Sequence, residues 1–293
     1  MDAPELVALI PRRLCTTKRG KFPDDSTLPF VSLAVEWQRV GVRADFWGMG
    51  AAGGEDSAER MYEVGGMMAA IGEQLGLACL SSYEVTNWKA LRTGSADQEV
   101  AREMSCRALV ELQAHYVLAM GHSLANLAGR VIAMDVDLRA DLLRHLKTDF
   151  PPYSEDRKDW IQLSLVSKLQ SIARSCVHGD MEGVVTPVLD LANSTAWTVL
   201  EESRGQDFHR WRPQTAGLRG AASGAFGAVE SGGAKSYSIT GGQLLGSDVA
   251  TKLAANSWIT TKDAMSEICT AMRRFEPALR SPIERLTNLV WTP

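Results

Sequence analysis

Apolar positions along this chain recur mostly at spacings of three and four, the period of an amphipathic α-helix, and no series of alternating strand-like positions appears. The longest such pattern covers residues 97–134, with acidic residues near its start as a helix dipole prefers. Shorter helical patterns cover residues 58–77, the surroundings of Trp88, and residues 135–147, 154–176, 180–202, 248–280 and 281–291. The pattern predicts an all-α fold, a helical bundle around a long central helix.

Two stretches do not follow the helical period. Residues 30–40 fit either a strand or a short helix. Residues 213–247 are rich in Gly, Ala and Ser, which predicts a long loop or linker with one short strand pair near residues 237–240. We therefore expect a main helical domain over residues 1–212, the Gly-rich segment 213–247, and a C-terminal helical segment over 248–293 that packs on the main domain.

The central helix carries a polar stripe at spacings of four, seven, four and four: Glu111, His115, His122, Asn126 and Arg130. On a helix these positions lie along one slowly drifting face. A buried polar group without a partner costs about 1–3 kcal/mol, so buried members of the stripe must satisfy one another or serve a site. Two interpretations stay open, a structural hydrogen-bond network between helices and a functional pocket.

Small residues form a second row on the same helix, because Gly121, Ala125 and Gly129 recur every four residues. This row predicts the close approach of another helix. Residues 112–129 carry no formal charge and are about as long as a membrane span, yet they include a glutamine, two histidines and an asparagine. We therefore expect a buried helix of a soluble protein and no membrane partner.

Composition adds few constraints. The formal charge of −4 is too small to indicate a nucleic-acid or membrane partner by itself. Five cysteines at wide spacings, without a CxxC pair, favour reduced buried thiols over a disulfide framework or a zinc module. The N-terminus lacks the basic start and long apolar core of a signal peptide, so we expect a cytoplasmic protein. Glu111 and His115 are spaced by four, not by the three of di-iron bundles, and we expect no metal and no cofactor.

Residues 204–213, RGQDFHRWRP, form a second candidate site. Basic side chains alternate here with Phe208 and Trp211. Guanidinium groups pair with phosphates and aromatic faces stack on bases, so we expect Arg210, Trp211 and Arg212 to bind phosphate or nucleic acid, together with Arg130 of the central helix. The structural alternative is that the two aromatic residues anchor the end of a helix while the arginines are surface charges.

Arg204 and His209 have the spacing R-x4-H, which resembles the R-x4-6-H motif of the HEPN superfamily of helical ribonucleases; Arg139 and His145 also fit. Members of this family are all-α, usually dimeric, and cut RNA without a metal. The resemblance implies that His209 transfers protons at the 2′-hydroxyl and that Arg204 stabilises the phosphate. We expect His122 and Asn126 to complete this catalytic site. Many members carry a polar residue after the arginine, where this chain has Gly205 or Ala140.

Two other functions compete with an RNA-cleaving protein. One is a non-catalytic helical protein that binds a protein partner or assembles with itself, for example as a homodimer. The other is a small-molecule enzyme with a buried polar pocket on the central helix. That enzyme requires Glu111, His115 and His122 to line a cavity.

Overall fold

The computed structural model describes residues 28–48, 55–209, 226–231, 234–239 and 247–287. It describes only the backbone of residues 28–29, 42–48, 96–97, 99–100, 103, 204–209, 226–231, 234–239 and 247–257. The fold is all-α, as the periodicity predicts. Its helices are α2 (Leu28–Gly48), α3 (Glu55–Lys89), α4 (Ala96–Ala133), α5 (Val136–Leu146), α6 (Val166–Ala173), α7 (Met181–Ala192), α8 (Thr195–His209), α10 (Ser247–Ala278) and α11 (Arg280–Thr287). Strands β1 (Phe226–Ser231) and β2 (Ala234–Ile239) pair antiparallel, with Phe226 opposite Ile239.

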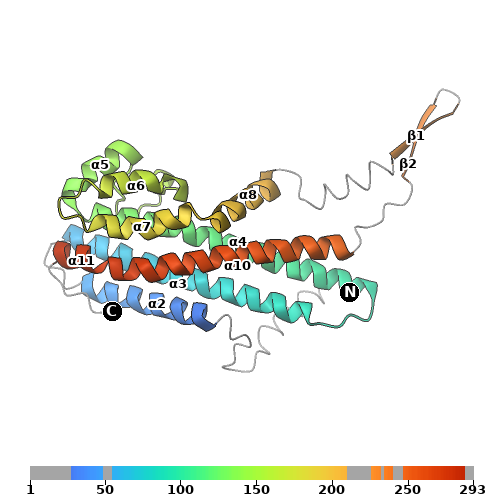
Figure 1. The fold of residues 1–293 in the computed structure, drawn as a ribbon, viewed down its shortest axis with the longest axis horizontal. Helices are drawn as coiled ribbons and strands as arrows, with labels where there is room; N and C mark the ends of the chain where they lie inside the picture. Colours follow the sequence, from blue (N-terminus) through green and yellow to red (C-terminus); the bar gives the residue numbers. More distant parts are fainter. Residues whose placement is uncertain (1–27, 49–54, 210–225, 232–233, 240–246, 288–293) are drawn as a thin grey trace.

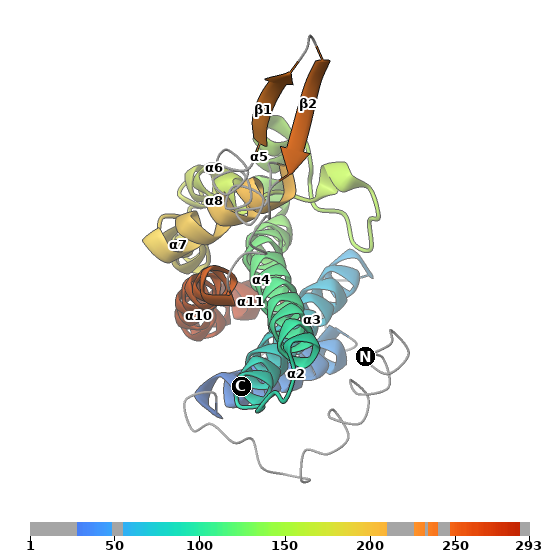
Figure 2. The same ribbon diagram turned by 90° about the vertical axis from the view of Figure 1, so that its right-hand side faces the viewer.

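The predicted central helix lies at the centre of the bundle as α4. Helix α3 packs on one side of it with α2 on the far side of α3, α10 runs alongside, and α5 to α8 lie on the opposite side (Figures 1 and 2). Ser95 caps the start of α4, because its hydroxyl accepts from the Gln98 N–H while the Gln98 side chain accepts from the Gly94 N–H. Helix α4 contacts α3, α10 and each of α5 to α8.

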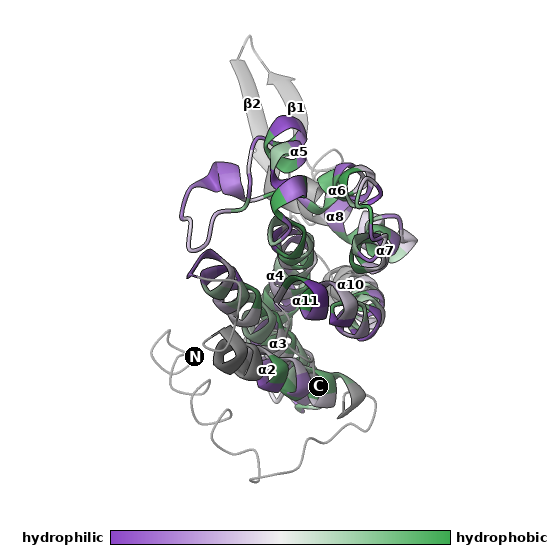
Figure 3. Ribbon diagram, turned by 90° about the vertical axis from the view of Figure 1, so that its left-hand side faces the viewer, coloured by the Kyte–Doolittle hydropathy of each residue, from purple (hydrophilic) through white to green (hydrophobic). Residues whose placement is uncertain are grey.

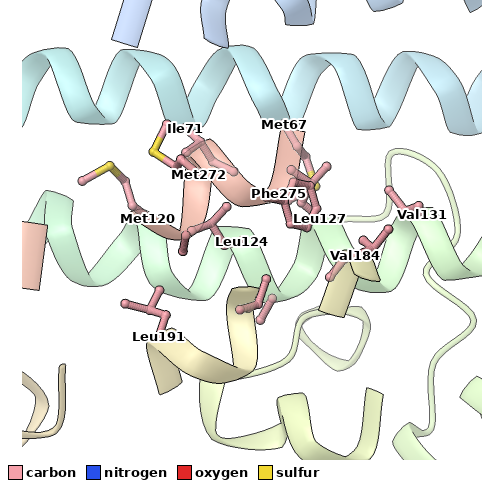
Figure 4. Packing of buried hydrophobic residues seen from close by; sticks show 14 of the residues in the cluster. Met67, Ile71, Met120, Leu124, Leu127, Val131, Val184, Leu191, Met272 and Phe275 are labelled. Carbon is pink, nitrogen blue, oxygen red and sulfur yellow. The ribbon is translucent and has the colours of Figure 1, made fainter. Parts of the chain in front are cut away.

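One hydrophobic core extends through the bundle, and four of its helices meet in the middle of it. Figure 4 shows apolar side chains of α3, α4, α7 and α10 in contact, among them Ile71, Leu124, Leu191 and Phe275, all of which are buried. Hydrophobic residues of these helices face one another, and hydrophilic residues cover their outer faces (Figure 3). Removal of this apolar surface from water is the main driving force for such a bundle.

The ambiguous stretch 30–40 belongs to a helix, α2, and glycines explain how closely α2 approaches α3. A Cβ atom added to Gly41 would lie 2.5 Å from the Gly65 carbonyl oxygen, and one added to Gly72 would lie 2.7 Å from the Ala34 carbonyl oxygen. Such distances leave no room for a side chain, so these two backbones touch directly.

Helix α3 is longer than predicted, because residues 58–77 and the short helix near Trp88 form one continuous helix. The hydroxyl groups of Ser81 and Thr86 donate to carbonyls one turn earlier, which satisfies them inside the helix. Among the described residues, α3 is the helix whose length and apolar composition would allow a membrane crossing. Its most apolar window is 56% buried inside the bundle, as expected of a core helix.

Two predicted helices are interrupted. The helix expected over residues 154–176 is wrong in its first half, where the chain makes the 3₁₀ turns η1 (Arg157–Asp159) and η2 (Leu163–Leu165) before α6 begins. The helix expected over 180–202 is divided into α7 and α8, and the Ser194 hydroxyl between them accepts from the Trp197 N–H. The first interruption has its cause in the polar stripe of α4.

Candidate functional site

The polar stripe of α4 divides into two halves with different surroundings. In the first half, Glu111 is exposed and accepts from Arg107 Nε at 2.9 Å, and His115 is exposed beside Tyr116. The second half lies beneath the chain that joins α5 to α6, called here the 147–165 segment. The stripe therefore does not form one continuous pocket, and Glu111 and His115 belong to the protein surface.

Asn126 holds the 147–165 segment by its backbone. Its buried carboxamide accepts from the Ile161 N–H at 2.9 Å and donates to the Ile161 carbonyl at 2.9 Å. The same amide nitrogen donates to the His122 carbonyl one turn earlier at 2.7 Å. One side chain thus pairs both backbone groups of a residue, as a neighbouring strand does in a sheet. This pairing explains why Trp160 and Gln162, on either side of Ile161, have extended backbone conformations.

His122 binds the backbone of the 147–165 segment two residues after Ile161, at Leu163. Its Nδ1 accepts from the Leu163 N–H at 3.1 Å, so that nitrogen carries no proton. The imidazole also meets the Trp197 ring of α8 edge to face, with ring centroids 5.6 Å apart. His122 therefore joins α4 to both the 147–165 segment and α8.

The row of small residues receives aromatic rings where the sequence predicted another helix. A Cβ atom added to Gly121 would lie 2.2 Å from the Trp197 ring, and one added to Gly129 would lie 2.3 Å from the Phe150 ring. The prediction of close approach is thus correct in position, but at these two glycines side chains and not a helix backbone fill the space.

Arg130 is the most deeply buried charge of the stripe, with 2% of its surface exposed. Its Nε lies 3.1 Å from Glu63 Oε1, and its guanidinium carbon lies 5.7 Å and 5.1 Å from the ring centroids of Phe150 and Trp160. Within the described chain, Nη1 and Nη2 have no hydrogen-bond partner. Burial lowers the pKa of Arg130, although the charges of Glu63 and Asp159 act in the opposite direction.

Phe150 stands in a strained backbone conformation that its neighbours maintain. Its φ of 52° lies in the left-handed region that bulky residues rarely adopt. Arg60 Nη1 donates to the Phe150 carbonyl at 3.0 Å, and the Phe150 N–H donates to the Thr148 hydroxyl at 2.9 Å. Arg60 also pairs with Asp56 at 3.1 Å, so α3 helps α4 to fix the segment.

Only part of the second candidate site, residues 204–213, belongs to the described residues. The backbone of Arg204 and His209 belongs to the last turns of α8, whereas Arg210, Trp211 and Arg212 lie outside the described residues. His209 is twelve residues beyond Trp197, roughly 18 Å along the helix axis from the turn that contacts His122. The expected roles of these five residues stay predictions.

The alternative motif pair lies on α5. Arg139 donates to the Ala133 carbonyl and to Asp56, and His145 is exposed. These contacts of Arg139 join α5 to the C-terminal end of α4 and the first turn of α3.

The cysteines in the described chain, Cys79, Cys106, Cys176 and Cys269, are free and buried, as predicted, and Cys15 lies outside the described residues. Burial raises the pKa of the Cys79 and Cys269 thiols to about 12, which makes them poor nucleophiles. The described part of the chain contains no group of three or more His, Cys, Asp or Glu side chains that could hold a metal ion.

Sequence reasoning identified the α4 side of this site and missed its other side. Glu63, Phe150 and Trp160 complete the surroundings of Arg130, but they come from α3 and from a segment without a regular period. The one available signal was the pair of adjacent prolines at 151 and 152, which predicts an irregular chain. Comparisons of the chain with protein-family models, with curated proteins and with solved structures find no match.

Proposed function

We propose that this protein assembles with a second copy of itself through the exposed first half of α4. Positions 18 apart on an α-helix project in nearly the same direction, since they are separated by about five turns. Met104, Ala108 and Leu112 therefore lie on the same line as the three covered residues of the polar stripe. The covered half of this face is polar, whereas the open half carries an apolar row beside the polar Glu111 and His115, with Met104 64% and Leu112 42% exposed.

The spacing of this row fits the packing of one helix against another. Residues four apart form the ridges that interdigitate when helices cross, and the small side chain of Ala108 lies between two large ones. In an antiparallel pair of α4 helices with twofold symmetry, Met104 of one copy meets Leu112 of the other, and the two Ala108 residues meet at the axis. The single observation that supports this proposal is an exposed apolar row on a face whose other half is buried.

Sedimentation velocity of the full chain tests the proposal. We expect a dimer at micromolar concentration and a monomer for the double variant Met104→Glu and Leu112→Glu, because opposed carboxylates would repel one another at the contact. The matched control is Val136→Glu with Val177→Glu, two exposed apolar residues outside α4, which should leave the dimer intact. A monomer at all concentrations, or a dimer that survives the α4 substitutions, would refute the contact.

A second candidate function is metal-independent RNA cleavage of the HEPN kind. Its support is the agreement between the all-α bundle and the motif Arg204-x4-His209 on α8. In this proposal His209 and Arg204 perform the chemistry, while His122 and Asn126 act through the position of the 147–165 segment. Purified protein incubated with RNA in EDTA should release fragments, and His209→Ala should abolish them. Intact RNA, or cleavage that His209→Ala leaves unchanged, rules this function out.

A further inference from the structure

We propose that Arg130 binds a small oxyanion, a carboxylate or a phosphate, through its Nη1 and Nη2 nitrogens. Its Nε is occupied by Glu63, and no described residue accepts a hydrogen bond from either of the other two nitrogens. A buried donor left without an acceptor costs about 1–3 kcal/mol, and more when it is charged. The four N–H groups on Nη1 and Nη2 of Arg130 are therefore stabilised if an acceptor from outside the described chain binds them.

Arg285 shows what a fully paired guanidinium looks like in the same protein. Its Nε and Nη2 donate to the two oxygens of Asp180 at 2.8 Å and 3.0 Å, and its Nη1 donates to Asp135 at 3.1 Å. Two carboxylates thus occupy all three nitrogens, although the Arg285 side chain is 23% exposed. Arg130 is far more buried, and among the described residues it pairs with one carboxylate, that of Glu63. By comparison with Arg285, an oxyanion with two acceptor oxygens would pair with Nη1 and Nη2 of Arg130.

The surroundings of Arg130 restrict the size of this ligand. Phe150 and Trp160 cover the guanidinium, and only 2% of the arginine is exposed, so the backbone of a nucleic acid or a protein cannot reach it. Trp160 itself is 44% exposed, so its indole ring lies between the Arg130 guanidinium and solvent. A rotation of that indole side chain would admit a small anion from solvent.

Nearby charges make the binding modest and supply a rival explanation. Glu63 already balances the charge of Arg130, and the charge of Asp159 also acts on it. The Asp159 carboxylate accepts a hydrogen bond from the Ser154 hydroxyl. If Asp159 turned toward Nη1 or Nη2, it would become the second carboxylate and leave no place for a ligand. Asp159→Asn separates the two cases, because it removes either a repulsive charge or the partner itself.

Thermal unfolding in sodium phosphate, compared with sodium chloride of equal ionic strength, tests the inference, with sodium acetate as a parallel arm. A ligand that binds only the folded state raises Tm with the logarithm of its concentration, by about 3 °C at ten times its Kd for a protein of this size. We expect this rise in the natural protein, a larger rise in Asp159→Asn, and none in Arg130→Lys, which keeps the charge but loses the planar fork. Arg274→Lys, at an exposed pair with Asp190, is the matched control and should respond like the natural protein.

A spectroscopic arm keeps the inference testable if Arg130→Lys does not fold. Phosphate bound beside Trp160 should change the tryptophan fluorescence of the natural protein, and Trp160→Phe should lose that change. The inference is overturned by an equal Tm in phosphate, acetate and chloride for both the natural protein and Asp159→Asn. It is also overturned if Asp159→Asn destabilises the protein without any anion response, since Asp159 would then be the second partner. Neither result bears on the α4 contact proposed above.

Discussion

At Asn126 one carboxamide supplies the hydrogen bonds that residue 161 would otherwise make inside a helix. Amide groups suit this role, because a single side chain both donates and accepts. Both hydrogen bonds are 2.9 Å long, which is the usual N–H···O distance, so the donor and the acceptor of the carboxamide are both well placed. Since residue 161 lies 35 positions further along the chain, the local sequence around it contains no sign of this partner.

Asn126→Ala should destabilise the protein by about 2–4 kcal/mol, since it leaves a buried N–H and a buried carbonyl of Ile161 unpaired. Asn126→Asp should also destabilise, because a carboxylate accepts from the N–H but faces the carbonyl without a proton to donate. Urea unfolding measures both effects. The control is Asn193→Ala at the exposed end of α7, expected to change stability by less than about 0.5 kcal/mol. A small effect of Asn126→Ala would mean that the segment does not depend on this contact.

The residues of the site could be predicted from the sequence only on one side. Spacing aligns His122, Asn126 and Arg130 because all three are on one helix. Their partners are 41, 35 and 67 positions away, and no local period connects residues at such separations. The choice between a network and a pocket was therefore open until the 147–165 segment was placed. For His122 and Asn126 the structure shows hydrogen bonds to backbone groups, and for Arg130 it shows two nitrogens without a hydrogen-bond partner among the described residues.

Among the elements, α4 owes its close contacts to glycine at two positions. Gly121→Ala and Gly129→Ala should each destabilise the protein by about 1–3 kcal/mol, because the added methyl group overlaps the Trp197 or Phe150 ring. Gly66→Ala and Gly76→Ala are matched controls within α3, where nothing lies within 4 Å of the added atom. These controls should stabilise by up to about 1 kcal/mol through helix propensity. Circular dichroism during thermal unfolding gives the change in stability of each of the four variants. If all four changes had the same sign, the close packing at Gly121 and Gly129 would be contradicted.

Helices were predictable where one apolar face continues without interruption, as in α4, α5 and α10. The prediction failed where long-range hydrogen bonds compete with the helix. Trp160, Leu163 and Val166 recur every three residues, which fits a helical face, yet the backbone around Ile161 pairs with α4 and only a 3₁₀ turn forms at Leu163. Periodicity records which side chains are apolar; it does not record which backbone groups have a better partner elsewhere.

Across the whole molecule, Arg285 joins three helices that are far apart in the sequence. From α11 it pairs with Asp135, which caps α5, and with Asp180 at the start of α7. Burial alone would raise the pKa of Asp180, but the hydrogen bonds and charge of Arg285 outweigh it and hold that pKa below its ordinary value of 3.8. The last helix is thus fixed to the layer that covers α4.

This ion pair should make part of the stability dependent on pH. A lowered folded-state pKa means that the contribution of Asp180 is complete above 3.8 and is lost as the pH falls from that value through the folded-state pKa. Asp180→Asn should therefore destabilise by roughly 1.5–3 kcal/mol at pH 7, and the difference should shrink below pH 3.8. Urea unfolding at pH 7, 5 and 3 checks this. Asp190→Asn, at an exposed pair, should show a small difference at every pH.

The backbone contacts of the 147–165 segment also determine how its amides exchange with deuterium. An irregular surface segment normally exchanges quickly, because its N–H groups face water. The N–H groups of Ile161 and Leu163 instead donate to Asn126 and His122, so they exchange only when the segment leaves α4. Protected amides in a region without a regular helix would thus report how often Arg130 becomes open to solvent.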